Sequence, residues 1–269
     1  PIGDTLTQNT SSLVTGENNM VKNNESVLVT GENNDVSGNT RYSLISGVTN
    51  KENNGYSNFT TGEMNNVKNE KTTSVNGYKN SVTDGSFNQI TGKENTSSSN
   101  SQSFISGTKN NVTSNNASTI LGSTNTVSGS KNTLVQGNTN TTSNSEYSMV
   151  TGKSNSTTSG LGVIVSGNNN TISSEQESLI AGKDNNVSSG TNNSVQGLNN
   201  NSNTNTTSLI TGKNNVVANN TTVSVFGSSH DISVNSVNTL VGGNQNSETT
   251  GTNNAIFGNL NKSSSKFST

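Results

Sequence analysis

The sequence contains no cysteine or tryptophan, and its one proline is Pro1. The absence of cysteine excludes a disulfide framework and thiolate metal sites. Because the proline is the first residue, the rest of the chain has none that would interrupt a ladder of backbone hydrogen bonds. Long apolar runs are also missing. We therefore expect neither a transmembrane helix nor a retained signal peptide.

Charged residues are scarce, at 11% of the chain, and the net charge is −2. No basic surface or nucleic-acid-binding motif is present, so nucleic acid is not an expected partner. The aspartates share no common spacing, carboxylate pairs do not recur, and the glycines do not open helices as in a phosphate-binding loop. We expect no metal, no cofactor and no catalytic chemistry.

Asparagine, serine, threonine and glycine dominate, which is also typical of a disordered polar linker. A regular glycine spacing argues against that alternative. Fourteen of the sixteen intervals between the repeat glycines are 15 residues and two are 16. The glycines are Gly16, Gly31, Gly47, Gly62, Gly77, Gly92, Gly107, Gly122, Gly137, Gly152, Gly167, Gly182, Gly197, Gly212, Gly227, Gly242 and Gly258. A fixed period of this length predicts a solenoid in which each repeat forms one coil.

Each repeat carries two short patterns typical of strands. Two residues before the glycine stands Val or Ile in fifteen of seventeen repeats, with Thr60 and Leu240 as exceptions. Three residues after it stands Asn in fifteen repeats, replaced by His230 and Gln245 in the others, and Val or Ile often follows two places on. Alternation with β-branched residues predicts strands. We expect all-β coils of two strands and two turns, with His230 in a structural role.

The repeated asparagine has two expected roles. It tolerates the left-handed backbone of a turn, and identical amides in stacked coils can bond to one another as a ladder.

An apolar side chain stands at an outward place of the first strand in fourteen coils, three residues or one residue before the glycine. These residues are Leu13, Leu28, Leu44, Phe59, Phe104, Leu121, Leu134, Met149, Ile164, Leu179, Leu209, Phe226, Val241 and Phe257. We call this set the apolar stripe. So continuous a patch exceeds what a soluble monomer tolerates, which predicts self-association. The sequence does not decide between two copies and three.

The remaining aromatic residues suggest a recognition surface. Arg41 is the only arginine, and Tyr and Arg are favoured in binding patches. We expect Arg41, Tyr42, Tyr56, Tyr78 and Phe87 to contact a receptor. Tyr42 and Phe87 share one repeat position with Tyr147, so packing at a corner of the coil is the alternative.

The repeat Ser–x–Val–x–Gly–x–x–Asn resembles the head repeat of YadA-like trimeric autotransporter adhesins. Clear matches are Ser148, Gly152 and Asn155, and Ser178, Gly182 and Asn185, and the likeness covers about residues 12–261. The chain departs from the family in using Val or Ile where Ala is common and in its 15-residue coil. The resemblance implies a left-handed parallel β-roll of about 17 coils that forms a homotrimer. It also implies one head domain over 1–269, with end segments 1–11 and 262–269.

The same resemblance implies a place and a role. Such heads stand on the Gram-negative outer membrane, joined to it by a neck, stalk and C-terminal anchor that this sequence lacks. They attach bacteria to host-cell receptors or extracellular matrix. The residue usage is similar to that of fusobacterial adhesins, some of which bind carcinoembryonic-antigen-related adhesion molecules.

A second resemblance is to plant ice-binding β-rolls, through segments such as Asn125–Gly129. Ice binding requires a flat and regular exposed face. Leu, Phe and Met interrupt the outer face of the first strand, and pairs such as Met20 with Lys22 and Asp35 with Ser37 make the second strand irregular. Ice binding is therefore the alternative to adhesion.

Overall fold

The computed structural model describes residues 3–233 and 235–264, and within them it contains strands and no helix. The chain divides into two compact units, Pro1–Gly137 and Asn138–Thr269. The coil pattern repeats about 17 times along the chain, which confirms the predicted all-β parallel β-solenoid. Residues 1–2 and 265–269 of the expected end segments lie outside the described residues.

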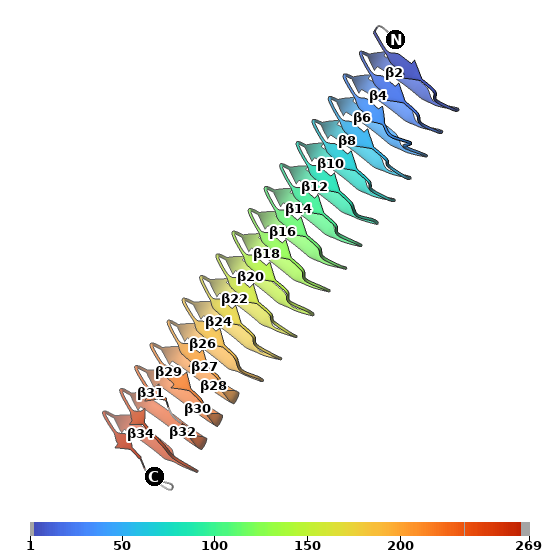
Figure 1. Cartoon of the computed structure of the whole chain (residues 1–269). Helices are drawn as coiled ribbons and strands as arrows, with labels where there is room; N and C mark the ends of the chain where they lie inside the picture. The colour runs from blue at the N-terminus through green and yellow to red at the C-terminus, as the bar shows by residue number, and fades with distance from the viewer. Residues whose placement is uncertain (1–2, 234, 265–269) are drawn as a thin grey trace. The chain divides into compact units, whose positions relative to one another are not determined.

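Most coils contribute one five-residue and one three-residue strand, as in β12 (Gln89–Lys93) and β13 (Thr96–Ser98). Both strands pair in parallel with the corresponding strands of the next coil, so that Ile90 lies beside Ile105 and Gly92 beside Gly107. Figure 1 shows the successive coils side by side within each unit. Strands pair at about 4.8 Å, so identical side chains stack on one another.

The first unit continues this pattern from end to end. Its longer strands are β2 (Leu13–Glu17), β4 (Leu28–Glu32), β6 (Leu44–Val48), β8 (Phe59–Glu63), β10 (Ser74–Tyr78), β12, β14 (Phe104–Thr108), β16 (Thr119–Ser123) and β18 (Leu134–Asn138). Its shorter strands are β1 (Thr5–Thr7), β3 (Met20–Lys22), β5 (Asp35–Ser37), β7 (Lys51–Asn53), β9 (Asn66–Lys68), β11 (Ser81–Thr83), β13, β15 (Asn111–Thr113) and β17 (Thr126–Ser128).

The second unit repeats the arrangement. Its longer strands are β20 (Met149–Lys153), β22 (Ile164–Asn168), β24 (Leu179–Lys183), β26 (Ser194–Leu198), β28 (Thr206–Lys213), β30 (Thr221–Ser228), β32 (Val237–Asn244) and β34 (Ala255–Asn259). Its shorter strands are β19 (Thr141–Ser143), β21 (Ser156–Thr158), β23 (Thr171–Ser173), β25 (Asn186–Ser188), β27 (Asn201–Asn203), β29 (Val216–Ala218), β31 (Asp231–Ile232), β33 (Ser247–Glu248) and β35 (Lys262–Ser263).

The coil has one more corner than the sequence predicts. In the coil of Gly92, backbone φ is positive at Glu94, Ser99 and Gln102. The last two flank Ser101, which forms a single-residue parallel bridge to the neighbouring coils. A third short side therefore closes each coil. The sequence predicts a left-handed backbone at the repeated asparagine. In this coil the preceding residue, Glu94, has the left-handed conformation instead, and Asn95 is buried.

The buried asparagines form the expected ladder, which we call the Asn column. The Asn110 backbone N–H and side-chain Nδ2 both donate to Oδ1 of Asn95, each at 3.0 Å. Nδ2 also donates to the carbonyl of Gly122 in the next coil, at 2.9 Å. In the first unit the column starts on Asp4, whose Oδ1 accepts from Asn19. Buried polar groups are stable only when hydrogen-bonded, and for Asn110 the stacked coils on either side supply these partners.

His230 occupies a place in the Asn column of the second unit, as predicted. Its backbone N–H donates to Oδ1 of Asn215 at 3.0 Å, and its Nδ1 accepts from the backbone N–H of Asn246 at 3.2 Å. The imidazole is buried, and its Nδ1 accepts the hydrogen bond that the asparagine Oδ1 accepts in other coils. Asn246, rather than Gln245, holds the next place in the column.

Candidate functional site

The apolar stripe lies on the outer face of the longer strands in each unit. In the first unit Leu13, Leu28, Leu44 and Phe59 are in register on β2, β4, β6 and β8. In the second, Met149, Ile164 and Leu179 are in register on β20, β22 and β24. Thirteen of the fourteen stripe residues keep part of their surface exposed, from partly exposed Leu44 to Phe257 at 62%. The alternating pattern therefore predicted the outer face for all but one residue.

Val241 is the exception, because the sequence alignment of its coil was wrong by one residue. Strand pairing places Gly243, not Gly242, beside Gly227 and Gly258. Val241 then faces the core, at 0% exposure, and Leu240 lies on the outer face at 38%. Gly242 takes an outward place, where a Cβ would stand 2.9 Å from the ring of Phe257. Leu240, and not Val241, is therefore the member of the apolar stripe in this coil.

Three of the five expected receptor residues come together in the first unit. Arg41 and Tyr56 are parallel bridge partners on the third side of adjacent coils. The rings of Tyr42 and Tyr56 meet edge to face, with centroids 5.7 Å apart. Arg41 Nε lies 3.5 Å from Glu25 Oε2, and the Tyr42 hydroxyl donates to Glu25 Oε1 at 3.4 Å. We call Glu25, Arg41, Tyr42 and Tyr56 the Arg–Tyr cluster.

The other two expected residues stand apart from the Arg–Tyr cluster. Tyr78 is the last residue of the longer strand β10. The Nζ atoms of Lys79 and Lys93 lie over its ring, 5.0 and 5.5 Å from the ring centroid. Phe87 is exposed at the same repeat position as Tyr42, three coils further along. The shared position alone gives no cluster, since exposed Tyr147 also occupies it.

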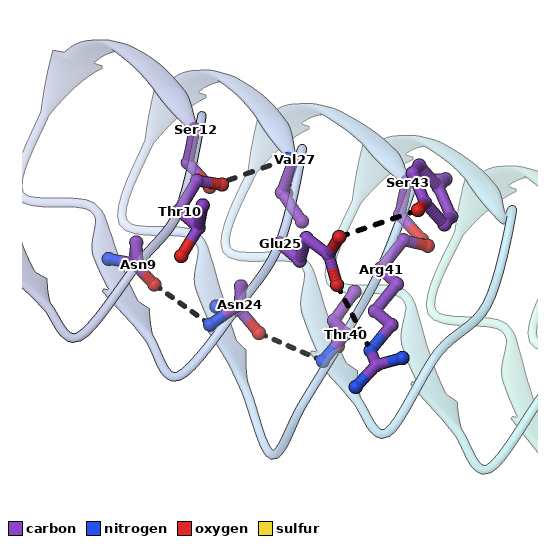
Figure 2. A network of polar contacts seen from close by, with 10 residues as sticks. Asn9, Thr10, Ser12, Asn24, Glu25, Val27, Thr40, Arg41 and Ser43 are labelled. Carbon is purple, nitrogen blue, oxygen red and sulfur yellow. Dashed lines mark hydrogen bonds and ion pairs between the residues drawn. The ribbon is translucent and has the colours of Figure 1, made fainter.

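A small cleft adjoins the Arg–Tyr cluster. Its volume is about 280 Å³, and it is lined by Gln8, Asn23, Asn24, Glu25, Asn39 and Arg41. Figure 2 shows the Glu25–Arg41 pair next to the row formed by Asn9, Asn24 and Thr40. In that row Asn24 N–H donates to Asn9 Oδ1 at 3.0 Å, and Thr40 N–H donates to Asn24 Oδ1 at 2.9 Å. The sequence signalled the cluster through the only arginine, but it did not indicate the cleft.

The outer face of the shorter strands is more regular than expected over part of the first unit. On β11, β13, β15 and β17 the two outward positions carry only Ser, Thr or Asn. Pairing aligns Ser81, Thr96, Asn111 and Thr126 in one row and Thr83, Ser98, Thr113 and Ser128 in the other. The result is a face with two rows of short polar side chains, more regular than that of the N-terminal coils.

Buried glutamates are the chemical feature that sequence reasoning missed. Glu52, Glu70 and Glu175 are at most 2% exposed. Glu52 accepts from Asn58 Nδ2 at 3.1 Å and from the Thr60 hydroxyl at 3.3 Å, which explains why Thr60 departs from the Val/Ile pattern. A glycine makes room beside each carboxylate: Gly55, Gly85 and Gly190. In the sequence, a glutamate at an inward position together with a glycine at the nearby corner would have indicated these buried carboxylates.

Burial raises the pKa of Glu52, Glu70 and Glu175 above the ordinary value of 4.5. A raised folded-state pKa means that the native protein binds protons more tightly than the unfolded chain. Their contribution to stability is therefore full below pH 4.5 and declines as the pH rises towards the folded-state pKa.

Glu52→Gln is expected to raise the melting temperature at pH 7 and to leave it nearly unchanged at pH 4.5. The Gln amide can donate to Thr60, whose hydroxyl accepts as well as donates, while its oxygen accepts from Asn58. Thermal unfolding followed by circular dichroism over pH 4–8 tests this. The exposed Glu63→Gln is the matched control, with no such gain. Equal melting curves for Glu52→Gln and the parent protein at both pH values would contradict a buried ionised carboxylate.

Within 3–233 and 235–264, no three His, Asp or Glu side chains gather in a group that could hold a metal ion. The same ranges contain no helix long and apolar enough to cross a membrane. Comparison with known proteins adds no identification, because no protein-family model and no curated protein matches the chain.

Proposed function

We propose that the chain is the head of a bacterial surface adhesin that acts as a homotrimer. The observation that carries the proposal is the apolar stripe, whose side chains stay exposed on the longer strands of each unit. Leucine, isoleucine, methionine and phenylalanine repeated in register make a face that is more apolar than a lone soluble protein tolerates. Parallel copies related by cyclic symmetry would bury this face against itself.

The finer features of the proposal come from the resemblance to YadA-like heads. They are a left-handed coil, three copies rather than two, and display on a Gram-negative outer membrane. The role is attachment, without a catalytic step, to a host-cell receptor or matrix protein. The exposed Arg–Tyr cluster supports a recognition role, since Tyr and Arg supply contact area and donors at low entropic cost.

A bead assay tests attachment directly. Beads coated with the oligomeric chain are expected to bind epithelial cells, or immobilised matrix proteins, at least tenfold more than beads coated with albumin. Cells with and without carcinoembryonic-antigen-related adhesion molecules identify whether those receptors are the target. Binding at the albumin level on every cell and matrix surface would refute the adhesion proposal.

A further inference from the structure

In the second unit the apolar stripe lies between two charged borders. One is at the end of the longer strands, where Lys153, Lys183 and Lys213 close β20, β24 and β28. The other is the third side and corner that precede these strands, where Glu146 and Glu177 lie. All five side chains are exposed. We call these two rows the strand-end border and the corner border.

The two borders of one copy are too far apart to neutralise each other. Glu146 and Lys153 stand on opposite sides of β20, and a five-residue strand alone spans roughly 13 Å. Among residues 3–233 and 235–264, neither forms an ion pair within the chain, and Glu177 forms none either. Lys183 has one exposed neighbour, Asp184, at 3.6 Å, which is a weak surface contact. Even with Asp184, the strand-end border keeps a net positive charge.

The first four repeats of the first unit show the reverse distribution. After their repeat glycines the strand-end border carries three acids and no cation, namely Glu17, Glu32 and Glu63. The corner border beside them carries two cations, Arg41 and Lys71, and one acid, Glu25, which pairs with Arg41 at 3.5 Å. Beyond Gly77 the strand-end side becomes basic, with Glu94 as the one acid among Lys79, Lys93 and Lys109. Opposite charge on the two borders therefore occurs in both units, with the signs exchanged.

Cyclic symmetry brings unlike borders together. When parallel copies turn the apolar stripe towards a common axis, the strand-end border of each copy meets the corner border of the next, because every copy presents the same face in the same sense. Opposite charges on the two borders attract across such a seam, while like charges would repel. The second unit thus carries, on its own surface, both halves of a complementary contact.

The charged residues also match in level along the second unit. Lys153 follows Glu146 by seven residues and Lys183 follows Glu177 by six, which is less than half of the 15-residue coil. With coils about 4.8 Å apart, the members of each pair differ in height by roughly 2 Å. Copies in register therefore place each lysine opposite a glutamate of the next copy. A shift by one coil would set Lys153 opposite Leu161 instead.

We propose that Lys153 and Lys183 of one copy pair with Glu146 and Glu177 of the next, and that these pairs hold the copies parallel and in register. The apolar stripe favours association but carries little direction, whereas charged pairs at the rim of an interface contribute specificity more than affinity. The partner of this surface is thus a second copy of the chain. The inference rests on the proposed homotrimer, for which it names the residues that orient the copies.

Cross-linking of introduced cysteines maps the seam, since the chain has none of its own. Glu146→Cys combined with Lys153→Cys, treated as the native oligomer with a short bismaleimide, should give covalently joined copies up to three times 27.8 kDa on a denaturing gel. The two cysteines of one copy stay apart because β20 separates them. Lys153→Cys combined with Thr171→Cys is the matched control and should remain single chains, because Thr171 lies on the outer face of the shorter strand β23.

Charge reversal tests the pairing itself. Lys153→Glu combined with Lys183→Glu should weaken association by about tenfold or more, since like charges then face each other across the seam. Adding Glu146→Lys and Glu177→Lys to the same chain should restore the parent value within about threefold, as expected for residues that interact directly. Analytical ultracentrifugation at low salt measures the chain concentration at half dissociation.

The reversals are made in a Met149→Ser background, whose weaker stripe brings dissociation into the measurable range. Asp231→Lys combined with Lys262→Glu is the matched control, because both residues are exposed on the shorter strands β31 and β35 of the same unit. This control should dissociate as the background does. Unchanged melting of each variant shows that weaker association is not a loss of fold.

Two results would overturn the border pairing while leaving the homotrimer standing: a trimer in which the Glu146→Cys, Lys153→Cys pair does not cross-link, or charge reversals that the second pair of changes does not rescue. Cross-linking of Glu63→Cys with Lys183→Cys in its place would show antiparallel copies and refute both proposals. A parent chain of 27.8 kDa in solution would also refute both.

Discussion

Replacing Leu134, Met149, Ile164 and Leu179 with serine is expected to dissociate the native oligomer into single chains. The parent should have a solution mass of three times 27.8 kDa, and the variant should approach 27.8 kDa. Each large apolar side chain buried at a seam contributes about 1.5–3 kcal/mol, so four losses per chain weaken the association by about 6–12 kcal/mol for each chain. Light scattering after size-exclusion chromatography measures both masses.

The matched control changes exposed apolar residues on the other sheet. Met20→Ser and Val216→Ser act on the outer face of β3 and β29, where the structure also leaves the side chains exposed. These two changes should leave the mass unaltered. If the four stripe substitutions leave the oligomer intact, the apolar stripe is not the seam.

A parent chain that is itself a clean monomer would contradict the trimeric adhesin and favour the ice-binding alternative. The two-row polar face of β11, β13, β15 and β17 would then be the candidate surface. Thermal hysteresis and ice shaping by that monomer would support it, and their absence would exclude it.

Gly152→Ala is expected to destabilise the protein by about 4 kcal/mol or more, the range reached only by severe core disruptions. Gly152 has φ +112°, and a Cβ there would lie 2.0 Å from the carbonyl oxygen of Gly167 in the next coil. That oxygen belongs to the stacked backbone, so a side chain could be accommodated only by separating the two coils. Urea or thermal unfolding followed by circular dichroism measures the loss.

Gly162→Ala provides the control within the same unit. Its φ is +65°, and the atom nearest to a Cβ would be 3.8 Å away, so the cost is limited to the left-handed backbone, about 1–2 kcal/mol. Equal losses in the two variants would show that backbone conformation, rather than the close approach of coils, makes the repeat glycine necessary.

Much of the fold was predictable because a solenoid repeats one environment. Each coil contacts mainly its neighbours, so a place such as that of Ile90 and Ile105 has the same surroundings in every repeat. Alternation then separates inner from outer residues, and counting from the glycine identifies the Asn column. The same regularity explains why the sequence assigned Gly242, and not Gly243, as the repeat glycine of its coil. Either glycine gives one interval of 15 residues and one of 16.

The departures from the repeat were less predictable. Thr60 is an unexplained exception in the sequence, and its hydroxyl finds Glu52 only when the inner faces of the coil meet. The 16-residue interval was visible, but the corner that holds the extra residue was not. Arg41 and Tyr56 are fifteen residues apart, and their bridge depends on the stacking of adjacent coils.

The sequence by itself determined the period, the two strands of each coil, the inner Val/Ile positions and the outward apolar stripe, because these follow from local alternation repeated at fixed spacing. The tertiary structure alone decided that Val241 is inside and Leu240 outside, that a third corner closes each coil, and that Glu25 and Arg41 line a small cleft. These features depend on which backbone atoms of adjacent coils face one another, and that pairing is a property of the stacked chain rather than of any single repeat.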